Sequence, residues 1–277
     1  MKKRIVVVLA GCAMASCLTG CGGGGGSSGG ASPPPPPMNQ AVGGIWKVDT
    51  TSNGAHVQGV GLVAENGQAV FFSHNLTNGC ADVGIGSISA TGSTISGTAK
   101  VGLVNFAFTP GITLGCTFSD GATSASETIS GSVAQRSSLT LTGTITTSLG
   151  TVLQGSPVTA TFDPLYNTAS SLAAISGNWT GPTNVVMSIS SGGAMFAQDP
   201  GSGCVVNGQV SLINSSYNAY AVSATYANCT GSASVLNGVT ATGLAAVDAT
   251  ASPNVLYVGY SATVAGATIL VAAQATR

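Results

Sequence analysis

Charged side chains are scarce in this sequence of 277 residues, which contains seven lysines and arginines and eight aspartates and glutamates. Proteins that bind nucleic acid through its phosphates need lysine and arginine clustered on one face. The only such cluster here is Lys2-Lys3-Arg4, so we expect no nucleic-acid partner. A surface with so little charge must be hydrated through Ser, Thr, Asn, Gln and the peptide backbone.

Side chains that bind metals or activate nucleophiles are also few. His56 and His74 are the two histidines, and no C-x-x-C motif occurs. Because zinc sites need spaced Cys and His ligands, we expect no metal and no cofactor. Most carboxylates stand in turn sequences such as ENG, SDG, FDP and QDPG, where they favour bonds to the nearby backbone. We therefore expect no catalytic residue and no enzyme activity. A hydrolase built on either histidine, or on two carboxylates, remains an alternative.

The N-terminus has the pattern of an export signal. Lys2, Lys3 and Arg4 precede a short, mostly apolar run from Ile5 to Leu18, which falls short of the roughly 20 residues of a membrane-spanning helix. Leu18-Thr19-Gly20-Cys21 then resembles a bacterial lipobox, which is cut before its cysteine. The sequence thus predicts a lipoprotein signal peptide over residues 1–20 and lipid attachment, including palmitate, at Cys21.

Two other interpretations of this region remain open. Leu9-Ala10-Gly11-Cys12 also matches a lipobox, although it leaves a very short apolar core. An ordinary secretory signal with incidental cysteines is the other alternative. Gly22 follows Cys21 where an aspartate often signals retention in the inner membrane, so the expected location is the outer membrane.

Residues 21–41 have the composition of a tether. A Gly/Ser run is followed by the five prolines Pro33 to Pro37. Flexible glycine-rich chain and stiff polyproline together give a spacer of roughly 30 Å. Such a spacer would hold a folded domain away from a lipid surface.

Four cysteines remain after the signal peptide and the lipidated Cys21, and they predict two disulfides. In an exported protein disulfides are the usual state of cysteine. Four cysteines allow three pairings, of which we favour Cys80–Cys116 and Cys204–Cys229, because each pair then lies within one proposed domain. Zinc is the rival use of these cysteines.

The rest of the chain predicts an all-β protein. Short apolar or alternating runs recur about every 10–14 residues and are separated by turn sequences such as SSGG and DPGSG. In Asn254–Ala262, for example, Leu256, Val258 and Tyr260 share one face. We expect two antiparallel barrel- or sandwich-like units in series, an N-terminal β domain over 42–165 and a C-terminal β-barrel over 166–277.

The two units share an order of features. Gly44-Ile45-Trp46 and Gly177-Asn178-Trp179 each open a unit, and each is followed by an apolar run, a turn, an aromatic strand and a Gly-Cys pair. A second cysteine then follows in each unit. This order predicts one module used twice, although convergent β-strand composition would also account for it.

The G-x-W motif resembles the opening motif of the lipocalins, within the calycins, whose tryptophan plugs one end of an eight-stranded barrel. The lipobox, tether and small β domains together resemble surface lipoproteins of Gram-negative bacteria, such as transferrin-binding and factor H-binding lipoproteins. This resemblance implies a lipid-anchored protein at the outer membrane or cell surface whose partner is a host protein, an envelope protein or a glycan.

The sequence therefore predicts a non-catalytic binding module, with its membrane contact made by the N-terminal lipid. A carrier of a small apolar ligand inside a barrel cavity is the alternative. Aromatic side chains favour interfaces, where they add contact area and hydrogen bonds, although in strands they also fill barrel cores. The candidate binding residues are Trp46, Trp179, Tyr257 and Tyr260.

Overall fold

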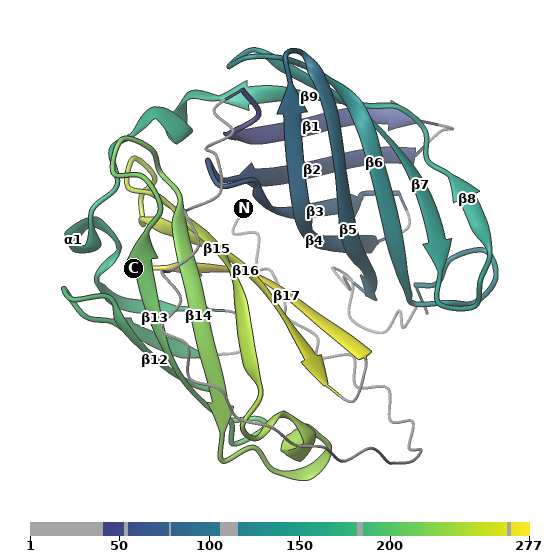
Figure 1. Cartoon of the computed structure of the whole chain (residues 1–277). Helices are drawn as coiled ribbons and strands as arrows, with labels where there is room; N and C mark the ends of the chain where they lie inside the picture. The colour runs from purple at the N-terminus through teal and green to yellow at the C-terminus, as the bar shows by residue number, and fades with distance from the viewer. Residues whose placement is uncertain (1–40, 53–54, 78, 106–115, 182–184, 265–266) are drawn as a thin grey trace, which may run out of the picture.

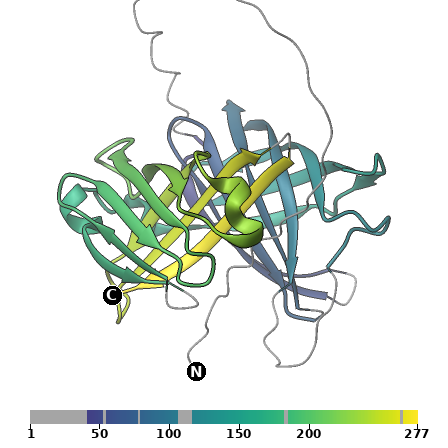
Figure 2. The same cartoon turned by 90° about the horizontal axis from the view of Figure 1, so that it is seen from below.

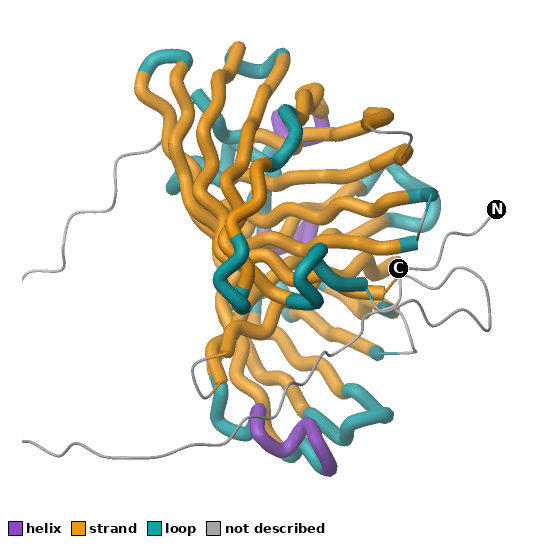
Figure 3. Tube along the Cα trace, turned by 90° about the vertical axis from the view of Figure 1, so that its right-hand side faces the viewer, coloured by secondary structure: helices purple, strands orange, loops and turns teal. Residues whose placement is uncertain are grey.

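The protein is described by a computed structural model that covers residues 41–277 except 53–54, 78, 106–115, 182–184 and 265–266. The predicted signal peptide, Cys21 and nearly all of the tether lie outside the described residues. Most of the described chain is β-strand, with short helical turns and loops between the strands (Figure 3). Within that part of the chain, no helix has the length and apolar character needed to cross a membrane.

Two antiparallel β-barrels follow each other along the chain and pack side by side (Figure 1). The all-β prediction is confirmed, and both units are closed barrels. The strands of the first are β1 (Gly44–Ser52), β2 (Ala55–Val63), β3 (Gln68–Asn75), β4 (Cys80–Thr91), β5 (Thr94–Asn105), β6 (Ser124–Ala134), β7 (Ser138–Thr147), β8 (Val152–Gln154) and β9 (Val158–Asp163).

The first barrel closes at β7, which pairs with β6 along one edge and with both β8 and β9 along the other. Its strands pair in the order β6-β5-β4-β3-β2-β1-β9-β7, and β7 pairs again with β6. Strand β9 pairs with Ser138–Leu141 of β7, and the short β8 pairs with Thr144–Thr146 of the same strand. Strands β8 and β9 therefore divide one edge of β7 between them.

The second barrel is an uninterrupted meander of eight strands that closes where Thr180 pairs with Thr276. Its strands are β10 (Gly177–Thr180), β11 (Val186–Ile189), β12 (Ala194–Gln198), β13 (Val205–Leu212), β14 (Tyr220–Ala227), β15 (Thr240–Asp248), β16 (Val255–Val264) and β17 (Ala267–Thr276). The 3₁₀ helix η3 (Gly231–Leu236) lies between β14 and β15. The segment between the barrels holds the 3₁₀ helix η1 (Pro164–Asn167) and the single-turn helix α1 (Leu172–Ile175).

Each barrel has its own apolar interior, built by side chains that alternate along the strands. Ile88 and Ile95 are 1% exposed in the first barrel. In the second, Leu256 is 1% exposed, and Val258 and Tyr260 pack against the same cluster, so their predicted shared face is confirmed. The alternation in these strands is therefore a reliable guide to which residues face the barrel interior.

The two barrels begin in the same way. Trp46 donates its indole N–H to the carbonyl of Val42 at 3.0 Å, and Trp179 donates to the carbonyl of Ile175 at 2.8 Å. Each tryptophan thus bonds the residue four positions earlier, at the start of its barrel. These equivalent bonds support the interpretation that one module is used twice.

The turn between the second and third strands repeats in the same way. Gly67 and Gly193 both have φ of +84°, a value that glycine adopts without the steric cost of a side chain. Their carbonyls accept bonds from Ile88 and Val210, each at 2.8 Å. The turn and its contact with the neighbouring strand are therefore the same in both barrels.

The disulfides are those predicted from the sequence, Cys80–Cys116 and Cys204–Cys229. In each barrel the first cysteine stands at the start of the fourth strand or next to it, and the second follows the fifth strand. Each bridge therefore occupies the same position in the topology of its barrel.

Candidate functional site

The segment that joins the barrels is fixed to both of them. Asp163 ends β9 and caps η1 by accepting a bond from the backbone N–H of Leu165 at 3.0 Å. Asn218, 2% exposed, donates its side-chain N–H to the carbonyl of Val247 at 2.7 Å and its backbone N–H to the carbonyl of Tyr166 at 2.9 Å. The junction thus has a defined geometry in which one barrel is held against the other.

An aromatic and polar cluster packs against this junction. The ring of Tyr166 stacks on Tyr217 with centroids 5.2 Å apart, and Arg136 lies 4.7 Å above the Tyr217 ring. Tyr166 also donates its hydroxyl to Glu65 at 3.2 Å. Glu65 is fully buried, and burial raises the pKa of its carboxyl. These contacts reinforce the fixed geometry, because they join the turn after β2 to the inter-barrel segment.

A third apolar cluster lies between the barrels, where their outer faces meet. The outer side of β15–β17 lies against strands of the first barrel in both views (Figures 1 and 2). Ile45, Leu62 and Val70 from the first barrel share this cluster with Leu244 and Ala246 from the second. The strands at the contact are thus buried on both of their faces.

A groove of about 350 Å³ opens beside this cluster, and we call it the inter-barrel groove. Its walls are the outer faces of β1–β3 and of β15–β17, and the junction forms part of its lining. A volume of this size falls at the lower end of the range for small-molecule sites, and such sites often occur between domains. The apolar floor is made by Ile45, Leu62, Val70, Leu165, Leu244 and Ala246.

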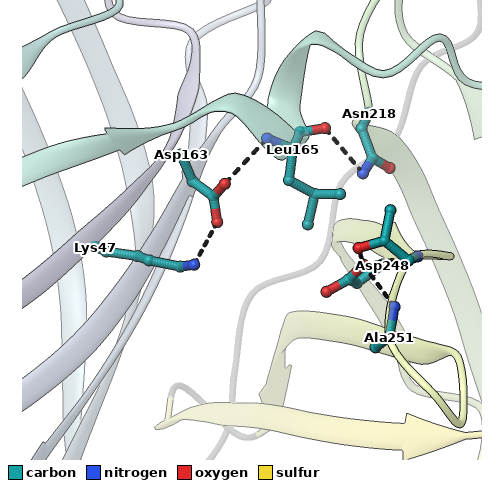
Figure 4. A network of polar contacts seen from close by, with 7 residues as sticks. Lys47, Asp163, Leu165, Asn218, Asp248 and Ala251 are labelled. Atoms are coloured by element: carbon teal, nitrogen blue, oxygen red, sulfur yellow. Dashed lines mark hydrogen bonds and ion pairs between the residues drawn. The ribbon is translucent and has the colours of Figure 1, made fainter.

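Charged side chains gather at one end of the groove. The Lys47 ammonium lies 2.6 Å from the Asp163 carboxylate (Figure 4). The bond to Asp163 raises the pKa of Lys47, and the charge of Asp248 acts in the same direction. We call Lys47, Asp163, Asp248 and Tyr257 the polar end of the groove.

Asp248 is held as a carboxylate. Its Oδ1 atom accepts bonds from the hydroxyl of Thr250 at 2.6 Å, from the Thr250 backbone N–H at 2.9 Å and from the Ala251 N–H at 3.2 Å. The bond from the Thr250 hydroxyl is the main reason why the pKa of Asp248 is lowered. At neutral pH the polar end therefore carries two carboxylates and one ammonium.

Asp49 adds a further carboxylate to the groove wall. Its Oδ1 lies 2.7 Å from Nε2 of His56, and its Oδ2 accepts a bond from Gln58 at 3.0 Å. The bond with His56 lowers the pKa of Asp49. His74 lies on the neighbouring strand β3, opposite Gln58. The ring of His56 is thus oriented by the carboxylate of Asp49.

The two candidate tryptophans lie in the barrel cores. Trp46 is 1% exposed and packs edge-on against Phe162 with centroids 5.5 Å apart. Trp179 is 0% exposed and lies under Arg277, whose guanidinium is 4.3 Å from the ring centroid. Neither indole contributes to the inter-barrel groove.

The two candidate tyrosines are separated by the alternation of β16. Tyr257 faces outward and lines the groove. Tyr260 faces the interior of the second barrel, where it accepts a bond from the Tyr226 hydroxyl at 3.0 Å. Of the four aromatic candidates, Tyr257 alone is brought to the groove.

A pair of acidic side chains, Asp82 and Glu127, lies inside the first barrel. Asp82 accepts a bond from the hydroxyl of Ser73, and burial raises the pKa of Asp82. Burial also raises the pKa of Glu127 to about 6, with a further contribution from the charge of Asp82. Across residues 41–277, apart from the gaps given above, no group of three or more His, Cys, Asp or Glu side chains is arranged to hold a metal ion.

The sequence interpretation missed the groove, although a signal for it exists. The stretches GVGLVA, QAVFF and GLAAV have apolar residues on both faces of a strand. A strand with one face in water alternates apolar and polar residues, whereas an apolar side chain at every position indicates burial on both faces. Lys47, Asp163 and Asp248 carried no such signal, because they lie on three separate strands and nothing in the local sequence indicates that the fold brings them together.

No protein-family model matches the chain, and no curated protein matches it. Among solved structures, the Aeromonas veronii immune modulator A aligns with 87% of this chain and 96% of its own, with a TM-score of 0.33 and 13% sequence identity. A likeness of this strength carries no argument about function.

Proposed function

We propose that this chain is a non-catalytic binding protein of the bacterial cell envelope, and that the inter-barrel groove is its binding site. The observation that carries the proposal is the combination of an apolar floor with a compact polar end in a groove of about 350 Å³. Apolar surface provides binding free energy, and a few placed polar groups orient the ligand.

The fixed junction supports binding at this place. Because the two walls belong to different barrels, a groove of constant shape needs barrels that do not move relative to each other. The bond from the Asn218 backbone N–H to the Tyr166 carbonyl and the shared apolar cluster provide that restraint. A preformed site avoids much of the entropy loss that ordering a mobile site would require.

The location of the groove favours it over a barrel interior as the ligand site. The interiors hold large buried side chains, including both tryptophans, Ile88, Ile95 and Leu256. The alternative function, a carrier with its ligand inside a barrel, would need these side chains to move aside. Binding in the groove needs no such rearrangement.

Binding is tested directly with a neutral fluorescent probe, N-phenyl-1-naphthylamine, and the Cys21→Ala chain, which needs no detergent. The fluorescence emission of the probe should rise when it binds to the chain. Val60→Phe, which places a ring in the groove, should abolish most of the rise. Val152→Phe is the matched control, because Val152 is 60% exposed on β8. A wild-type groove that leaves the probe dark, or equal binding by both variants, contradicts the proposal.

The envelope location rests on the N-terminal pattern and on the two disulfides, which are typical of oxidising compartments. In this proposal acyl chains on Cys21 hold the protein at the outer membrane and the tether presents the barrels to a host protein, an envelope protein or a glycan. Several acyl chains anchor firmly, since each buried CH₂ contributes about 0.8 kcal/mol. Cys21→Ala should abolish palmitate labelling and release the chain from membranes. Cys12→Ala should change neither, and the reverse pattern would place the anchor at Cys12.

A further inference from the structure

We infer that the ligand of the inter-barrel groove is a small cationic amphiphile, with an apolar body on the floor and one positively charged group at the polar end. This inference rests on the proposed function, because it names the class of ligand for the same groove. It is carried by the balance of charge at the polar end and by the geometry of Asp248.

The polar end has an excess of negative charge. The Lys47 ammonium is engaged by the Asp163 carboxylate at 2.6 Å. One ammonium and the two carboxylates of Asp163 and Asp248 leave a formal charge of −1, and Asp49 on the wall formed by β1 adds to it. A cationic group would neutralise this excess, whereas a ligand carboxylate would be repelled by it.

The carboxylate of Asp248 is oriented for such a contact. Its Oδ1 atom accepts three hydrogen bonds from the turn that follows β15. Figure 4 shows the other carboxylate oxygen directed away from this turn, toward the side on which Lys47 lies. A ligand ammonium or guanidinium placed there could donate to Oδ2 without breaking a bond within the protein.

Tyr257 provides an aromatic surface in the same place. It is half-buried on the outer face of β16 and lines the groove. Burial and the nearby carboxylates raise the pKa of its hydroxyl, so the ring stays neutral at physiological pH. Neutral aromatic rings attract cations to their faces, so the aromatic ring and the carboxylate favour the same kind of ligand group.

The apolar body follows from the floor. Ile45, Leu62, Val70 and Leu244 present aliphatic side chains and no charge. The groove volume of about 350 Å³ suits one alkyl or aryl group of medium length rather than a long acyl chain. A ligand with both parts would bury its apolar body and place its cationic group at the carboxylates.

The test compares three ligands that share one decyl chain: decylamine as its ammonium ion, decanol and decanoate. Each is titrated calorimetrically into the Cys21→Ala chain at neutral pH and low salt, below its micelle concentration. We expect the ammonium to bind tightest and decanoate weakest. A charge-assisted hydrogen bond corresponds to roughly a tenfold to hundredfold preference for the ammonium over the alcohol.

Two variants separate the contribution of the Asp248 charge to ligand affinity from that of the apolar floor. Asp248→Asn keeps an acceptor for the turn and should reduce ammonium affinity about tenfold while leaving decanol binding unchanged. Asp199→Asn is the matched control, because Asp199 also caps a turn, through Gly201 and Ser202, and does not line the groove. Circular dichroism confirms that each variant is folded.

The outcomes distinguish a failure of groove binding from a failure of the cationic ligand class. If none of the three ligands binds, the groove is not the binding site and the proposed function fails with it. If all three bind equally, or if decanoate binds tightest, groove binding stands and the cationic class is wrong. An ammonium preference that survives Asp248→Asn also overturns the inference.

Discussion

Gly259 of the second barrel lies directly against Val70 of the first, and a methyl group added at Gly259 would overlap Cγ1 of Val70. Both residues lie at the contact between the outer faces of the barrels, and both line the groove. The close approach of the barrels at this point therefore depends on a glycine that has no side chain to separate them.

Gly259→Ala should destabilise the protein by about 1–3 kcal/mol, the range for overpacking a well-packed site. The free energy of unfolding in urea, followed by far-UV circular dichroism, measures this loss. Val70→Ala should make room for the new methyl group. The double variant should then lose less stability than the sum of the two single changes, and strict additivity would show that the residues do not touch.

Trp46 and Trp179 should contribute to a similar extent to the free energy of unfolding. Trp46→Phe and Trp179→Phe each remove the N–H that bonds a buried carbonyl and leave a small cavity. An unpaired buried acceptor costs about 1–3 kcal/mol, and the cavity adds to this loss. We expect losses of similar size in urea unfolding. A large loss from one substitution and none from the other would contradict the idea that both tryptophans plug their barrels in the same way.

Glu127 should make the protein less stable as the pH rises. Its pKa is about 6 in the folded protein and 4.5 ordinarily, so the folded state holds the proton more tightly. The stabilisation from the proton on Glu127 amounts to about 2 kcal/mol. It is fully present below pH 4.5 and is lost as the pH rises to 6. Glu127→Gln should remove this part of the slope and be the more stable variant at pH 7.

Urea unfolding at pH 4.5, 5, 6 and 7 tests this expectation. Glu65 and Asp82 also have raised pKa values, so part of the slope should persist in the variant. Wild-type and Glu127→Gln curves that run parallel over this pH range would contradict the burial of a titrating Glu127.

Both disulfides should stabilise their barrels to a similar extent. They close loops with sequence separations of 36 and 25. The chain-entropy estimate for loops of this length is about 3–4 kcal/mol each. Replacing either cysteine pair by alanines should lower the urea midpoint by a comparable amount. Mass spectrometry of the unreduced protein should also show no free thiol among these four cysteines, and a labelled thiol would contradict the pairing.

Local patterns predicted the features of this fold that lie within one barrel. Alternation along Asn254–Ala262 gave the interior face of a strand, and the division into two units gave the disulfide pairing. The contact between the barrels was not predicted, because it brings together residues such as Val70 and Gly259 that are far apart in the sequence. Asp82 and Glu127 were also missed, because their positions inside the first barrel depend on which face of β4 and β6 turns inward.

The candidate site was predicted only in part. Tyr257 was named as a binding candidate from its residue type, and the structure places it in the groove. Trp46 and Trp179 were named for the same reason and lie in the cores. Residue type cannot separate these cases, since aromatic side chains are favourable both in a barrel interior and in a ligand site.

The most direct test of the groove as the binding site is an NMR titration of the methyl-labelled chain with decylamine. We expect shifts at Leu62, Val70 and Leu244, which line the groove, and none at the interior residues Ile88 and Ile95. Shifts confined to the interior methyl groups would contradict the groove and support a ligand held within a barrel.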